Sequence, residues 1–172
     1  NVEIENLAVF GEMDFQILPR WSLFGGLRYD HEKLGYSRIY RDIKDNEIIN
    51  SKSISQSSSA DAVLPMIGIN YEINKNNTIG LKSQKSYRAG GVEYDLLNNT
   101  EYKFKDETVW NYELSLSGNS PDKKINYSAN LFYMDWKNQQ VNIPQISGDY
   151  STGIISNVND SQVYGGELEI QS

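Results

Sequence analysis

His31 is the first residue whose type could bind a metal, because it lies between Asp30 and Glu32. Imidazole and carboxylate groups are common metal ligands. A chain with one histidine and no cysteine, however, cannot build the usual catalytic triads or zinc clusters. His31 lies at the end of a predicted strand, so the sequence favours a solvated residue at a sheet rim over a metal ligand.

Carboxylate pairs could perform acid–base chemistry, and Glu167 and Glu169 share one face of a predicted strand. Glycosidases need two carboxyl groups that flank a bond in a cleft, whereas strand alternation alone explains this pair. Gly90-Gly91 lacks the Lys-Ser/Thr and the helix of a phosphate loop, which favours tight backbone turning. We therefore expect no enzyme active site, no metal site and no cofactor.

The composition excludes several classes of protein. The formal charge is -7 with no basic stripe, so we expect no nucleic-acid partner. No apolar run reaches the roughly 18 residues of a membrane helix. Barrel strands are not excluded, because they alternate apolar and polar residues. The 12 Tyr and 3 Trp fit the interfacial belts of membrane barrels, and they also fit carbohydrate-binding β-sandwiches.

Period-two alternation predicts an all-β, antiparallel chain of about seven strands. In the first strand, Leu7, Val9 and Met13 share one face while Glu12 and Asp14 share the other. We predict strands near residues 7–17, 21–32, 63–73, 79–88, 110–117, 125–133 and 164–170.

The connections between the predicted strands alternate short and long. Short turns fall at 18–20, 74–77 and 118–122, and long polar segments fall at 33–61, 89–107 and 137–160. An up-and-down outer-membrane barrel has short periplasmic turns and long extracellular loops. Strands of about ten residues, tilted near 45°, would cover its apolar band of about 25 Å. The opposite face, with Arg28, Lys82 and Glu113, would line the lumen.

Seven is an odd number of strands, whereas bacterial single-chain barrels have even numbers. A seven-stranded open sheet would also leave two bare edges, which lipid does not tolerate. We therefore expect further strands after Ser172 and before Asn1. An isolated chain should aggregate or require detergent. Trp21, Tyr29, Tyr87, Trp110 and Tyr133 lie near strand ends or on the apolar face, and interfacial girdles explain them better than ligand stacking does.

Several phrases in order resemble the barrel of TonB-dependent receptors. Gly26-Leu27-Arg28-Tyr29-Asp30 resembles the family's "GLRYD", and Ser86-Tyr87-Arg88-Ala89-Gly90-Gly91 is similar to "GFRPGG", with Ala89 where the family usually has Pro. Two further phrases, which begin at Glu107 and Leu131, are similar to "ETLWNYELG" and "LFYMDWKDQQ". Ser156-Asn157 followed by Tyr164-Gly165-Gly166-Glu167-Leu168-Glu169 is similar to "TNAGKARSYGVELE".

This resemblance implies that residues 1–172 are a middle-to-late segment of a larger transmembrane β-barrel of about 22 strands with a plugged lumen. It implies a bacterial outer-membrane receptor that takes up a scarce nutrient, most simply a ferric siderophore. The implied partners are outer-membrane lipid, a small-molecule ligand and the inner-membrane TonB complex, the last through a plug and TonB box outside this chain. Arg88 and three tyrosines in long segments, Tyr94, Tyr102 and Tyr150, are the expected ligand contacts, because loops contact ligand in this family.

Two other readings remain. A small outer-membrane barrel without a plug, a porin or an adhesin, would end one strand later. A soluble, Tyr-rich β-sandwich that binds carbohydrate would fold and stay soluble without detergent.

Overall fold

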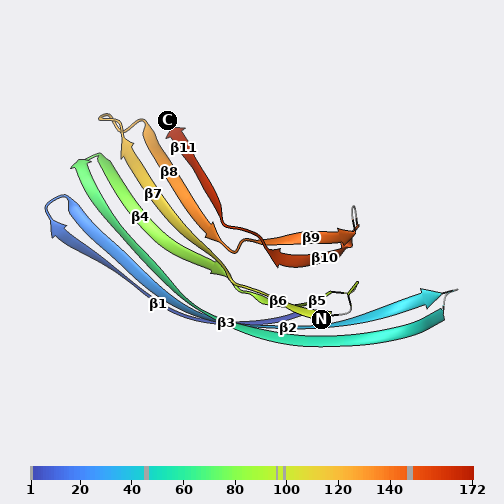
Figure 1. Cartoon of the computed structure of the whole chain (residues 1–172). Helices are drawn as coiled ribbons and strands as arrows, with labels where there is room; N and C mark the ends of the chain where they lie inside the picture. Colours follow the sequence, from blue (N-terminus) through green and yellow to red (C-terminus); the bar gives the residue numbers. More distant parts are fainter. Residues whose placement is uncertain (1, 45–46, 96, 99, 147–148) are drawn as a thin grey trace.

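A computed structural model describes residues 2–44, 47–95, 97–98, 100–146 and 149–172. Seven long strands form one antiparallel sheet in the order β1-β2-β3-β4-β7-β8-β11 (Figure 1). They are β1 (Val2–Leu18), β2 (Trp21–Lys44), β3 (Glu47–Asn74), β4 (Asn77–Arg88), β7 (Glu107–Asn119), β8 (Asn126–Lys137) and β11 (Ser161–Gln171). The predicted all-β sheet of seven strands is confirmed.

Two smaller hairpins interrupt this sequence of strands. One pairs β5 (Gly91–Asp95) with β6 (Thr100–Phe104), and the other pairs β9 (Gln140–Ile146) with β10 (Asp149–Asn157). Figure 1 shows the turns β1–β2, β3–β4 and β7–β8 at one end of the sheet and the hairpins at the other. We call these the turn end and the hairpin end.

Local geometry explains the short connections at the turn end. Arg20 takes a φ of 74°, the left-handed conformation that reverses the chain directly after Pro19. In the next turn, the Asn74 side-chain oxygen accepts a hydrogen bond of 2.9 Å from the Asn76 backbone N–H. Asparagine side chains commonly close turns in this way.

The three long connections differ from the irregular loops that the sequence suggests. Strands β2 and β3 continue through the polar stretch at 33–61, and their pairing runs from Trp21–Tyr71 to Lys44–Glu47. Strands β5 and β6 and strands β9 and β10 likewise form within the other two segments. A hairpin with water on both faces needs no apolar side, so its strands carry no alternation to detect.

The register of the sheet gathers apolar side chains from all seven strands on one face. Leu81 lies opposite Leu114, and Leu114 lies opposite Leu131. The face is exposed in this sheet, with Leu7 at 67% and Leu168 at 72% of their full accessible areas. Its members include Leu7, Val9, Met13, Phe15, Leu27, Val63, Ile67, Leu81, Leu114, Leu131, Leu168 and Ile170.

This apolar face is not the core of a sandwich. Among the residues whose side-chain burial the structure describes, Ile54 is the one hydrophobic residue that is buried. A continuous apolar surface of this extent must be covered, and a lipid bilayer covers such a surface on a barrel. No helix of the described residues is long and apolar enough to cross a membrane.

Aromatic rings lie at both ends of the apolar face. Trp21 and Tyr71 pack at the turn end with ring centroids 4.5 Å apart. Toward the hairpin end, the ring centroid of Tyr112 lies 6.4 Å from that of Trp110 and 6.2 Å from that of Tyr133. Two aromatic bands separated along the strands are the pattern of interfacial girdles.

The opposite face of the sheet carries charged side chains in pairs. Lys82 lies directly opposite Glu113, and their charged groups are 2.9 Å apart. Arg28 contacts Asp30 at 2.8 Å along strand β2. Because the apolar face meets lipid, this polar face lines the interior of the barrel.

Candidate functional site

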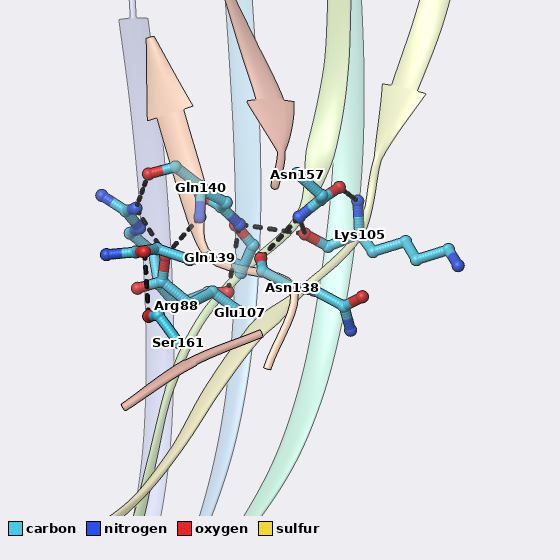
Figure 2. A network of polar contacts seen from close by, with 9 residues as sticks. Arg88, Lys105, Glu107, Asn138, Gln139, Gln140, Asn157 and Ser161 are labelled. Carbon is cyan, nitrogen blue, oxygen red and sulfur yellow. Dashed lines mark hydrogen bonds and ion pairs between the residues drawn. The ribbon is translucent and has the colours of Figure 1, made fainter. Parts of the chain in front are cut away.

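A polar network occupies the hairpin end, where β4, β7, β8 and β11 leave the seven-stranded sheet (Figure 2). We call it the rim network. Its members come from four stretches of chain. The first holds Arg88, the second Lys105 and Glu107, the third Asn138 to Gln140, and the fourth Asn157 and Ser161. It is the part of the described chain in which the predicted site residue Arg88 acquires specific partners.

The Glu107 carboxylate is the buried centre of this network, since the residue retains only 5% of its accessible area. Its Oε2 atom lies 2.9 Å from the Arg88 guanidinium and also accepts a hydrogen bond from the Gln140 backbone N–H. The same Arg88 nitrogen donates to the Gln140 carbonyl at 2.8 Å. A buried charge is tolerated when it is paired and hydrogen-bonded, as here.

The Gln140 side chain joins three backbone segments. Its amide nitrogen lies 3.0 Å from the carbonyl oxygens of both Ala89 and Lys105, and the residue is 8% exposed. These contacts tie the start of strand β9 to both ends of the β5–β6 hairpin. A buried amide that uses its donors in this way fixes local geometry more than it binds a ligand.

Asn157 performs a similar role on the other side of the network. Its amide nitrogen donates to the carbonyls of Lys105 at 2.9 Å and Asn138 at 2.8 Å. Its side-chain oxygen accepts from the Lys105 backbone N–H at 2.6 Å. Asn138 itself adopts a φ of 52°, which is the tight turn between β8 and β9.

A second set of contacts joins the two hairpins directly. The Tyr102 hydroxyl donates to the Ile155 carbonyl at 2.6 Å and lies 3.1 Å from the Glu93 carboxylate. That carboxylate also accepts from the Ile155 backbone N–H at 3.0 Å. The hairpins β5–β6 and β9–β10 are therefore hydrogen-bonded to each other as well as to the sheet.

Asp95 organises the tip of the β5–β6 hairpin. Its carboxylate accepts from the backbone N–H groups of Leu97 and Asn98, both at 2.9 Å, and from the Asn98 amide at 2.7 Å. These bonds, with the Asn98 side chain the strongest, lower the pKa of Asp95, and an amide donor from Gln145 of the other hairpin adds to the effect.

The expected ligand contacts take different places. Arg88 and Tyr102 lie within the hydrogen-bonded contacts of the hairpin end. Tyr94 is half-buried in β5, opposite Glu101. Tyr150 belongs to β10, but its side chain lies outside the described residues. Ligand contact by these four residues stays a prediction.

His31 lies beside the carboxylate of Asp61. Its Nδ1 atom lies 2.8 Å from Asp61, and the Tyr29 hydroxyl donates to the same carboxylate oxygen at 2.6 Å. Within the described residues, no group of three or more His, Cys, Asp or Glu could hold a metal. A Cβ atom on Gly90 would overlap the backbone of residues 104–106, so glycine is required there by a close approach of two backbone segments.

Sequence reasoning missed Glu107, Gln140 and Asn157 as members of this site. Gln140 lies 52 residues from Arg88 and 33 residues from Glu107 along the chain. No local spacing connects residues so far apart. Glu107 reads as an ordinary surface carboxylate at the start of a strand, because its burial arises only when the hairpins fold over it.

Comparison with known proteins agrees with the fold. A family model described as TonB dependent receptor-like, beta-barrel, matches residues 1–172. The ferric yersiniabactin uptake receptor FyuA from Yersinia pestis superposes with a TM-score of 0.73 at 21% identity, over 98% of this chain and 24% of that chain.

Two further solved structures are similar in the same way. The closed form of the ferric-catecholate import receptor Fiu from E. coli K12 gives a TM-score of 0.73 at 17% identity, over 98% of this chain and 25% of that one. The alcaligin receptor FauA from Bordetella pertussis gives a TM-score of 0.67 at 17% identity, over 98% of this chain and 27% of that one. The chain therefore spans about a quarter of these receptors. It belongs to the TonB-dependent receptor β-barrel family and forms part of a bacterial outer-membrane protein.

Proposed function

We propose that this chain forms part of the wall and rim of a receptor that takes up a ferric siderophore across the outer membrane. Uptake in this proposal is energised through the inner-membrane TonB complex. The observation that carries it is the seven-stranded sheet with one continuous lipid-facing side, together with its likeness to three ferric-siderophore receptors over 98% of the chain.

The organisation of the hairpin end supports a receptor. The β5–β6 and β9–β10 hairpins are held by buried polar groups such as Glu107 and Gln140. A binding surface on loops needs such support, because loops left to themselves do not hold a fixed geometry. We propose that this end faces outward and contacts the cargo, with Arg88 and Tyr102 holding the surface and with Tyr94 and Tyr150 as ligand contacts predicted from the sequence.

The alternative soluble sandwich lacks support from the structure. A sandwich covers the apolar side of one sheet with a second sheet. The apolar face here, with Leu7 and Leu168 among its exposed members, has no second layer against it in the described part of the chain. We propose no enzymatic role, since receptors of this family act as transporters.

Iron uptake by cells tests this proposal. A strain lacking the complete receptor gene is compared with the same strain carrying it, under iron limitation, with radioactive iron supplied on several siderophores. We expect receptor-dependent uptake of at least one chelate, and we expect its loss when the TonB complex is deleted. Uptake that depends on the receptor but not on TonB would favour a plug-less porin. No receptor-dependent uptake of any iron chelate would overturn the cargo assignment.

A further inference from the structure

A recess lies where the two hairpins join the sheet. We call it the lysine recess. It is lined by Lys103, Lys105, Asn138, Asn157, Asn159 and Asp160, with Val158. Its lining is rich in groups that donate hydrogen bonds, namely two ammonium groups and three side-chain amides.

The recess is built on a fixed floor. Asn157 bonds both backbone groups of Lys105 and the carbonyl of Asn138, so three stretches of chain meet at one side chain. Figure 2 shows the Lys105 side chain leading away from the other labelled residues, toward open space. The backbone that carries this lysine is held, while its ammonium group stays free to meet a ligand.

The charge of the recess is positive although the chain carries a formal charge of -7. Lys103 and Lys105 are exposed and form no ion pair with the described residues. Lys103 and Lys105 are two residues apart at the end of strand β6. In extended chain the Cα atoms of such residues are about 7 Å apart, and their side chains lie on one side. The carboxylate in the lining, Asp160, lies 2.9 Å from the Lys137 ammonium, which neutralises it.

We propose that the lysine recess binds an anionic group of the cargo, so that the receptor takes a negatively charged iron chelate in preference to a neutral one. This inference deepens the proposed function and rests on it for the identity of the ligand as an iron chelate. Two ammonium groups carried on one side of this short segment suit a ligand with two or more negative charges. The side-chain amides of Asn138 and Asn159 can supply hydrogen bonds to carboxylate or phenolate oxygens, whereas Asn157 uses both of its amide N–H groups within the floor.

Binding measurements on the complete, detergent-solubilised receptor test the inference. The probes are the negatively charged ferric complex of 2,3-dihydroxybenzoate, the neutral ferric complex of acetohydroxamate, and metal-free citrate. The test variant carries Lys103→Gln with Lys105→Gln. The control variant carries Lys75→Gln with Lys123→Gln, which removes the same charge from the turn end of the sheet.

We expect the test variant to bind the anionic probes roughly fivefold more weakly for each lysine removed, and to bind any neutral chelate unchanged. The control variant should bind all probes like the wild type, and salt should weaken only the anionic probes. Equal anion binding by the test variant and the wild type would overturn the inference and leave the proposed function standing. So would a wild-type receptor that binds only the neutral chelate.

The remaining outcomes separate the two proposals. Lysine-dependent binding of citrate without binding of either iron chelate would support the recess and contradict the iron cargo. Binding of none of the three probes by the wild type would overturn both.

Discussion

Tyr102 and Ile155 join two hairpins that are separate in sequence. The Tyr102 hydroxyl donates to the Ile155 carbonyl at 2.6 Å, and 53 residues of chain separate them. Strand β10 is therefore held by a contact with β6 as well as by its pairing with β9. The β5–β6 and β9–β10 hairpins should open and close together, since opening either one breaks this bond.

We expect Tyr102→Phe in the complete receptor to uncouple the hairpins without unfolding the barrel. The variant loses about 1 kcal/mol of hydrogen bonding at the hairpin contact. Amide hydrogen exchange near Ile155 should therefore accelerate about fivefold, whereas exchange in β7 and β8 stays unchanged. Tyr164→Phe is the control, because Tyr164 is 80% exposed on the apolar face. Unchanged exchange near Ile155 would show that the contact does not couple the hairpins.

Substitutions at Arg88 and Glu107 should have unequal effects. The Glu107 side chain is 7% exposed and that of Arg88 is 57% exposed. Arg88→Met leaves a buried carboxylate without its counter-charge, and we expect a loss of about 2 to 3 kcal/mol. Glu107→Gln leaves an arginine that water can solvate and keeps an acceptor for the Gln140 backbone N–H, so we expect a loss of about 1 kcal/mol.

Thermal unfolding of the complete receptor variants in detergent measures this difference. The double variant Arg88→Met with Glu107→Gln should be more stable than Arg88→Met alone, because the uncompensated charge is gone. Equal losses for the two single variants would mean that Glu107 is hydrated in the assembled receptor and that its burial carries no electrostatic cost.

The sequence predicts the sheet well and the rim poorly, for a physical reason. Trp110, Tyr112 and Leu114 alternate with polar residues because lipid lies on one side of strand β7 and the lumen on the other. Beyond the membrane both sides are wet, so β2 and β3 continue through a Ser-rich stretch that carries no alternation. Glu107 and Gln140 meet only because the hairpins fold back, and no local pattern encodes a contact 33 residues apart.

The Asp95 carboxylate should make the tip of the β5–β6 hairpin sensitive to acid. Hydrogen bonds led by the Asn98 side chain lower the pKa of Asp95 below its ordinary value of 3.8. A carboxylate with a lowered folded-state pKa stabilises the fold above the unfolded pKa, and this stabilisation is lost as the pH falls through the folded-state pKa. The tip should therefore stay closed at pH 5 and above and open only as the pH falls below the ordinary value of 3.8.

Pepsin cleavage at Leu97, which is 53% exposed at this tip, measures the opening. We compare the wild-type receptor with Asp95→Asn at each pH. The ratio of their two cleavage rates is independent of the pH dependence of pepsin itself. We expect the variant to be cleaved faster at pH 5 and the two rates to converge as the pH falls. A ratio that stays constant between pH 5 and pH 2.5 would contradict a structural role for the carboxylate.

The pairing of Phe24 with Gly68 predicts which glycine of the sheet tolerates a side chain. The two residues lie directly opposite each other, and a Cβ atom on Gly68 would overlap the Phe24 ring. An aromatic ring that covers a cross-strand glycine in this way shields the backbone and fixes the register. Gly11 is the matched control, because a Cβ atom there would meet nothing within 4 Å.

We expect Gly68→Ala to destabilise the complete receptor by about 1 to 3 kcal/mol, since the ring must leave its rotamer or the strands must shift. Gly11→Ala should be neutral or slightly stabilising, because alanine reduces the entropy of the unfolded chain. The second-site change Phe24→Leu should recover part of the loss in Gly68→Ala, because the smaller side chain vacates the space above residue 68. Urea unfolding in detergent measures all three, and equal stability of the two alanine variants would show that the ring moves aside without cost.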